Sequence, residues 1–99
     1  MVIKNKYDLA LTDKDIESYR KVLINKIYKL LPLKEEGLDW QKYLESIQLE
    51  LGGFSRIVGM TPELICLLSK LESLYELDSF ALYRKTIFEC LNVVDELYA

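Results

Sequence analysis

Four helix starts constrain this chain more than any other feature of its sequence. Thr12, Asp39, Thr61 and Asp78 each carry a side-chain oxygen that can accept a hydrogen bond from the first turn of a helix. Each is also bracketed by a large apolar residue one position before it and another four positions after it, the spacing of a hydrophobic staple. Asp15 follows Thr12 at the spacing of a capping box. The sequence therefore predicts four helices.

Proline and glycine suggest where the first two helices end. Pro32 is expected to stop the first helix, because proline disfavours helical geometry in the residue before it. Gly52 and Gly53 are expected to stop the second in the left-handed conformation, leaving at most a short turn over 54–59. The predicted helices lie near 13–31, 39–51, 62–76 and 79–97.

Each predicted helix carries an apolar stripe at spacings of three and four residues. The stripes contain Ile16, Tyr19, Leu23, Ile27, Leu30; Trp40, Tyr43, Leu44, Ile47, Leu51; Leu64, Leu67, Leu68, Leu71, Leu74, Tyr75; and Phe80, Tyr83, Ile87, Leu91, Val94, Tyr98. Short connections favour antiparallel neighbours. We therefore predict an all-α fold, a small antiparallel four-helix bundle.

Residues 1–11 follow a different pattern from the rest of the chain. Ile3, Tyr7, Leu9 and Leu11 fall on alternate positions, as in a short strand. A single strand has no partner inside a helical domain. We expect a short extended N-terminal arm lying on a bundle domain of residues 12–99, in preference to a strand that pairs with a second copy.

Length and composition fit one domain in a reducing compartment. The chain has 99 residues, 51% of them hydrophobic and 29% charged, which suits a packed globule. Its two cysteines form no disulfide framework. The beginning of the sequence is polar and lacks the pattern of a secretory leader, and no apolar run reaches the roughly 20 residues of a membrane helix. We expect a cytoplasmic protein.

The absence of histidine removes most familiar catalytic arrangements. Histidine-based triads, histidine general bases and Cys/His zinc sites cannot be built from this sequence. Glu72 and Glu76 lie one turn apart on a predicted helix, but a solvated helix face explains them. We therefore predict no enzymatic activity, no catalytic residue, no metal site and no cofactor.

Every predicted helix also has a large apolar residue far from its stripe. Val22, Leu49 and Phe88 fall among polar neighbours, with Arg84 beside Phe88, and Val93 widens the apolar arc of the fourth helix. A contiguous apolar patch on a surface is typical of a protein-binding site. We therefore predict a protein–protein interaction module, a small regulator, inhibitor or immunity-type protein, that self-associates and binds through these five residues.

A nucleic-acid-associated protein is the alternative. Its basis is the cluster Arg20, Lys21, Lys26 and Lys29 on the first helix, and the segment RIVGMTPELICLL, which resembles the turn and second helix of a helix-turn-helix. The outer face of that second helix carries glutamates, which would repel phosphates. The net charge of −3 also argues against polyanion binding.

Overall fold

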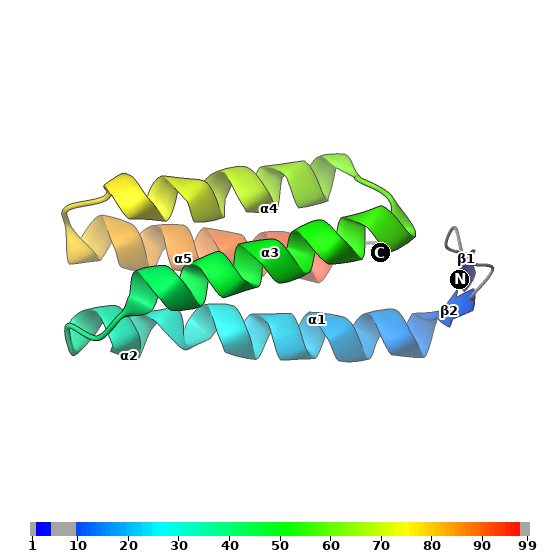
Figure 1. Ribbon diagram of the computed structural model, residues 1–99, viewed down its shortest axis with the longest axis horizontal. Coiled ribbons are helices and arrows are strands. Elements are labelled where there is room, and N and C mark those ends of the chain that lie inside the picture. The colour runs from blue at the N-terminus through cyan, green and yellow to red at the C-terminus, as the bar shows by residue number, and fades with distance from the viewer. Residues whose placement is uncertain (1, 5–9, 98–99) are drawn as a thin grey trace.

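The computed structural model describes residues 2–4 and 10–97 of the chain, which form a rod of antiparallel helices (Figure 1). The elements are β1 (Val2–Lys4), β2 (Ala10–Thr12), α1 (Asp13–Tyr28), α2 (Leu30–Glu35), α3 (Trp40–Val58), α4 (Pro62–Ser73), a 3-10 turn η1 (Leu74–Glu76) and α5 (Phe80–Glu96). The rod measures 43 × 21 × 20 Å along its principal axes. The predicted all-α bundle is thereby confirmed.

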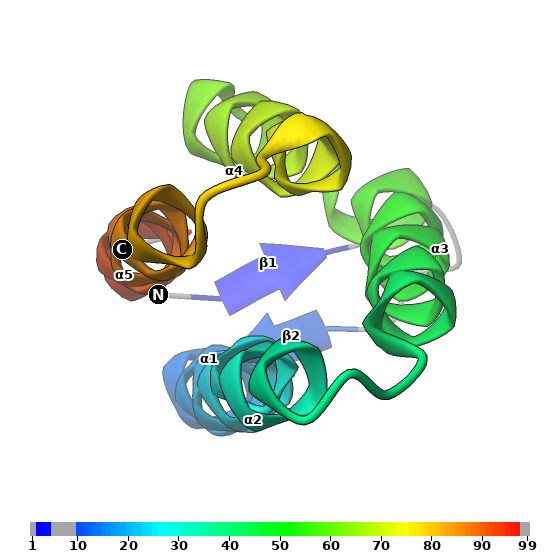
Figure 2. The same ribbon diagram turned by 90° about the vertical axis from the view of Figure 1, so that its left-hand side faces the viewer.

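Seen from one end, the helices occupy the corners of a square (Figure 2). The α1–α2 pair contacts α3 and α5, and α4 contacts the same two helices from the other side. Helices α3 and α5 therefore lie at opposite corners of the bundle (Figure 2). This arrangement decides which exposed side chains can share a surface.

Three of the four predicted helix caps are present. The Thr12 hydroxyl accepts a hydrogen bond from the Asp15 backbone N–H at 3.2 Å, and the Asp15 carboxylate accepts one from the Thr12 N–H at 3.0 Å. The hydrogen bonds that the Thr12 N–H and the Thr12 hydroxyl donate to the Asp15 carboxylate lower the pKa of Asp15. Asp39 and Thr61 cap α3 and α4 in the same way.

The fourth predicted cap is wrong by one residue. Ser79, not Asp78, caps α5 by accepting a hydrogen bond from the Leu82 N–H at 3.4 Å. The shift moves Asp78 outside the helix and removes the expected staple, since Leu82 is exposed while Leu77 packs against the core.

Both predicted stop signals are also wrong. Pro32 lies in the first turn of α2, where its missing N–H would have no intrahelical acceptor, so the chain is helical again after an interruption at Lys29 and continues to Glu35. Gly52 and Gly53 lie inside α3, which runs through the expected loop and ends at Gly59. Gly59 has φ +94°, a conformation that favours glycine.

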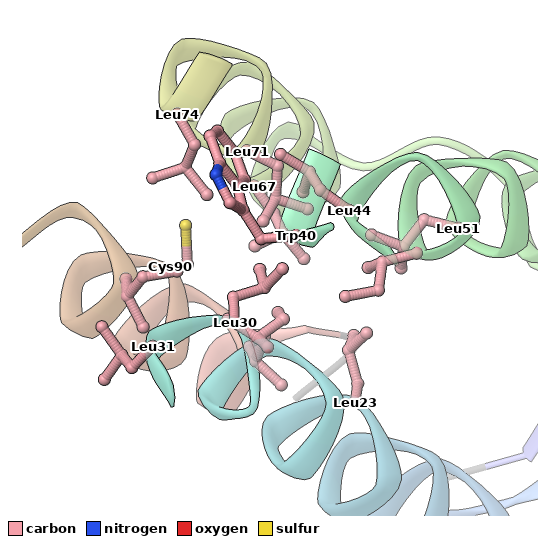
Figure 3. Packing of buried hydrophobic residues seen from close by; sticks show 14 of the residues in the cluster. Leu23, Leu30, Leu31, Trp40, Leu44, Leu51, Leu67, Leu71, Leu74 and Cys90 are labelled. Carbon is pink, nitrogen blue, oxygen red and sulfur yellow. The ribbon is translucent and has the colours of Figure 1, made fainter. Parts of the chain in front are cut away.

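The core is a continuous apolar column along the rod. Its fully buried members come from every helix and include Leu23, Ile27, Leu30, Leu44, Ile47, Leu51, Leu64, Leu67, Leu71, Leu74, Tyr83 and Ile87. Trp40 is also buried, and its indole reaches in among leucines of three helices (Figure 3). Burying such side chains stabilises the fold by about 1.5–3 kcal/mol each.

The N-terminal segment pairs with itself. Strands β1 and β2 are antiparallel, with Val2 opposite Thr12 and Lys4 opposite Ala10. They lie beyond the first turn of α1, past the end of the bundle (Figure 1). The expected extended backbone is present, but as two paired strands and not as one strand along the bundle. Tyr7 and Leu9 of the predicted alternation lie outside the described residues.

Candidate functional site

The flank where α5 meets the α1–α2 pair collects aromatic side chains from both. On α5, Tyr83 and Ile87 point into the core, so Phe80, Arg84 and Phe88 follow one another at four-residue spacing along its edge. The facing edge of the α1–α2 pair carries Tyr28, Leu31, Pro32 and Glu35. We call these seven residues the α2–α5 surface.

A hollow of about 380 Å³ lies at the centre of this surface. All of its residues except Phe88 line the hollow, and Phe88 adjoins it through two ring contacts. The Phe88 ring meets Tyr28 edge-on, with centroids 6.3 Å apart, and the Arg84 guanidinium carbon lies 5.5 Å from the Phe88 centroid. Tyr28 is 52% exposed, Phe88 40% and Phe80 38%, so three rings border one shallow cavity.

Two residues of opposite charge line the hollow. Arg84 contributes from α5 and Glu35 from α2. Among the residues that the structure describes, neither side chain forms a salt bridge. The surface therefore offers a cation and an anion, both solvent-exposed, beside apolar rings.

The rings of the surface continue into the core. Phe80 stacks on buried Tyr83 with centroids 6.2 Å apart, and Tyr83 meets Trp40 edge-on at 5.2 Å. The Lys34 ammonium lies over both inner rings, 4.4 Å from the Trp40 centroid and 4.9 Å from that of Tyr83. Burial raises the pKa of Tyr83, whose hydroxyl has no hydrogen-bond partner in the described part of the chain. The α2–α5 surface is thus supported by packed aromatic rings.

Of the five predicted binding residues, the structure brings together only Phe88 and Arg84. Val22 is exposed on the side of α1 that faces α3, since Lys26 one turn later bonds to Glu50 of α3. Leu49 is 71% exposed on α3, at the corner opposite α5. Val93 is partly buried against the core.

The four cations of the nucleic-acid alternative all have partners within the chain. Arg20 donates to the Leu97 carbonyl at 2.7 Å, and Lys26 pairs with Glu50. Lys21 lies 3.4 Å from Glu17, and Lys29 lies over the Tyr43 ring at 5.5 Å. These contacts tie α1 to α5, to α3 and to itself, so the cluster has a structural explanation.

The reactive groups are scattered. Within residues 12–97, no three carboxylate or thiol groups converge in a way that could hold a metal ion. Burial raises the pKa of the Cys90 thiol to about 12, while Cys66 is exposed on α4. Glu72 accepts a hydrogen bond from Gln48 of α3, and Glu76 lies in the 3-10 turn. None of the helices in the described part of the chain is both long and apolar enough to cross a bilayer.

Sequence reasoning missed five members of the α2–α5 surface. The pattern placed Phe80 in the core stripe and Pro32 at a helix stop, and it did not single out Tyr28, Leu31 or Glu35. The spacing of Phe80, Arg84 and Phe88 is a usable signal, because residues four apart lie on one edge of a helix. The facing edge could not be predicted because part of it lies on α2, and the expected stop at Pro32 leaves no helix there.

Comparison with known proteins adds no further assignment: the chain matches no protein-family model, no curated protein and no solved structure.

Proposed function

We propose that this chain is a non-enzymatic protein-binding module that docks its partner on the α2–α5 surface. The observation that carries the proposal is a gathering of three exposed aromatic rings, two lining one hollow and the third beside it, next to a guanidinium that forms no salt bridge with the described residues. Aromatic residues and arginine are enriched where protein interfaces gain most of their binding energy. Under this proposal the chain acts in the cytoplasm as a small regulator, inhibitor or immunity-type protein.

Ring contacts reduce the side-chain freedom that docking on this surface would cost. The Phe80 ring contacts Tyr83, and the Phe88 ring contacts Tyr28 and Arg84. Single exposed apolar residues such as Leu49 are ordinary features of protein surfaces. A partner would place an apolar side chain in the hollow and a carboxylate against Arg84.

Position-specific photo-crosslinking tests the proposal. A benzophenone amino acid is placed at Phe88 and, as a matched control, at Leu49, and cells producing each variant are irradiated. We expect a protein adduct, either a second copy or another protein, at position 88 and none at position 49. The captured species is then purified and its affinity measured by calorimetry.

In that measurement Phe88→Asp should weaken binding by at least about thirtyfold, the loss typical of a central aromatic residue. Leu49→Asp should bind as the parent chain does. Both variants should keep their helical circular dichroism, because both positions are exposed. Equal adducts at the two positions, or equal affinities for the two variants, would refute docking on the α2–α5 surface.

A further inference from the structure

We infer that the occupant of the α2–α5 surface is a second copy of this chain, docked about a two-fold axis so that Arg84 of each copy pairs with Glu35 of the other. The inference rests on the proposed protein-binding function and names its partner. It follows from the charges that border the hollow and from the symmetry that such a pair of charges permits.

Arg84 and Glu35 line the same hollow from α5 and α2, yet no salt bridge joins either of them to another residue in the described part of the chain. Two other cations at helix contacts, Lys26 and Lys70, do pair with carboxylates of a neighbouring helix. Arg84 contacts the Phe88 ring but no carboxylate of the described residues, so both charges of the hollow can take partners on a docking molecule.

In a two-fold interface the same surface is used twice, so residue i of one copy meets residue j of the other and j meets i. A hollow that carries its cation on α5 and its anion on α2 satisfies this rule, because a half-turn sets α5 of one copy on α2 of the next. Each dimer then contains two Arg84–Glu35 pairs. Between them lie the side chains of Tyr28, Phe80 and Phe88 from both copies.

The α2–α5 surface also carries apolar area that a dimer would bury. Half of the chain is hydrophobic, and the α2–α5 surface leaves three aromatic rings partly in water. A two-fold dimer would cover six such rings at once. Covering apolar area is the main favourable term in association, while the charge pairs fix orientation.

Charge reversal with mixing tests this inference. Sedimentation equilibrium first measures the dimer dissociation constant of the parent chain. Arg84→Glu and Glu35→Arg should each weaken the homodimer by about tenfold or more, since each creates two like-charge contacts per dimer. Lys85→Glu is the matched control, because Lys85 is exposed on the same helix next to Arg84 and does not line the hollow.

Mixing the two single variants gives the sharper result. In an Arg84→Glu chain paired with a Glu35→Arg chain, both cross-contacts become attractive again. Native mass spectrometry should therefore find a heterodimer in the mixture although neither variant dimerises well alone. The double variant R84E/E35R should likewise recover the homodimer.

Three outcomes would overturn the inference: a parent chain that stays monomeric up to millimolar concentration, single variants that dimerise as well as the parent, or a mixture without heterodimer. The proposed function fails separately. If the parent is monomeric while the Phe88 photo-crosslinker captures another protein whose binding Phe88→Asp abolishes, the docking surface stands and only the second copy is refuted. If no protein is captured at Phe88 either, both fail.

Discussion

The α2–α5 surface exposes three aromatic rings and the outer face of α3 exposes Leu49, but the two differ in what lies beside these side chains. Phe88 contacts Tyr28 and Arg84 and lies along the same edge as Phe80, which stacks on the buried core. Leu49 of α3 is more exposed than these three rings, at 71%, but it does not line the hollow. The proposed binding surface is therefore distinguished by the neighbours of its exposed apolar residues and not by how exposed they are.

The largest expected effect tests whether the aromatic rings truly support the α2–α5 surface. Trp40→Ala should lower the free energy of unfolding by about 3–5 kcal/mol, because it removes a buried ring that contacts Tyr83 and Tyr75. Chemical denaturation at a fixed protein concentration measures this change. A loss no larger than that of an exposed substitution would show that the rings at this end are not packed as described.

A second test measures how well the core beneath α5 excludes water. The Cys90 pKa is raised to about 12 in the folded chain from an ordinary value of 9.0, so the unfolded chain loses this proton first as pH rises. The contribution of the protonated Cys90 thiol to the free energy of unfolding is therefore fully present below pH 9 and is lost between pH 9 and 12. The fall attributable to Cys90 has a slope of at most about 1.4 kcal/mol per pH unit.

Cys90→Ala should flatten this alkaline decline, measured as unfolding free energy against pH. The exposed Cys66→Ala variant is the control and should leave the slope unchanged. Tyr83 adds to the decline above pH 10 in both variants, because burial raises its pKa as well. Parallel declines for the parent and Cys90→Ala would contradict a dry core at this position.

A third, smaller effect concerns the hydroxyl of Tyr83. Its ring is fully buried and its oxygen has no hydrogen-bond partner among the described residues. Tyr83→Phe should therefore raise the unfolding free energy by up to about 1 kcal/mol, since it removes a desolvated polar group and keeps the ring contacts. A loss of stability in thermal denaturation would mean that the hydroxyl is satisfied in solution.

The smallest effect is expected for Leu49 on the outer face of α3. Leu49→Glu should change the unfolding free energy by no more than about 0.5 kcal/mol, because the side chain is 71% exposed. Denaturation of this variant beside the parent chain checks the expectation. A destabilisation above 1 kcal/mol would show that the outer face of α3 is covered in solution, and the contrast with the α2–α5 surface would disappear.

Helix starts could be predicted from this sequence because their chemistry is local. A helix cap needs only a Thr hydroxyl or an Asp carboxylate three residues before a free backbone N–H, so it requires no distant partner. This rule predicts the caps at Thr12, Asp39 and Thr61, which the structure confirms. Ser79 and Asp78 are adjacent and chemically similar, so local rules could not separate them.

Helix ends depended on packing that no local rule describes. Proline is tolerated in the first turn of a helix, and the interruption at Lys29 places Pro32 in the first turn of α2. Gly52 and Gly53 stay helical because Leu51 before them and the half-buried Phe54 after them belong to one continuous packed face. Glycine lowers helix propensity but does not overrule tertiary contacts.

Only two of the seven residues of the candidate site, Phe88 and Arg84, could be predicted. Phe88 and Arg84 stood out because both lie on one helix, where spacing fixes their relative positions. The facing edge comes from α1 and α2, and its place beside α5 depends on which helices are neighbours in the bundle. For the same reason, the sequence could not exclude Leu49 and Val22 from a shared surface with Phe88.

The rod is about twice as long as it is wide, and this shape affects how the number of chains in an assembly must be measured. A particle twice as long as it is wide drags more solvent than a sphere of equal mass, so a lone chain elutes early from a sizing column and imitates a heavier species. Side-by-side docking along α2 and α5 would make the particle rounder, so its apparent radius would grow far less than its mass. Molecular weight here must therefore come from light scattering, native mass spectrometry or sedimentation equilibrium, which read mass without assuming shape.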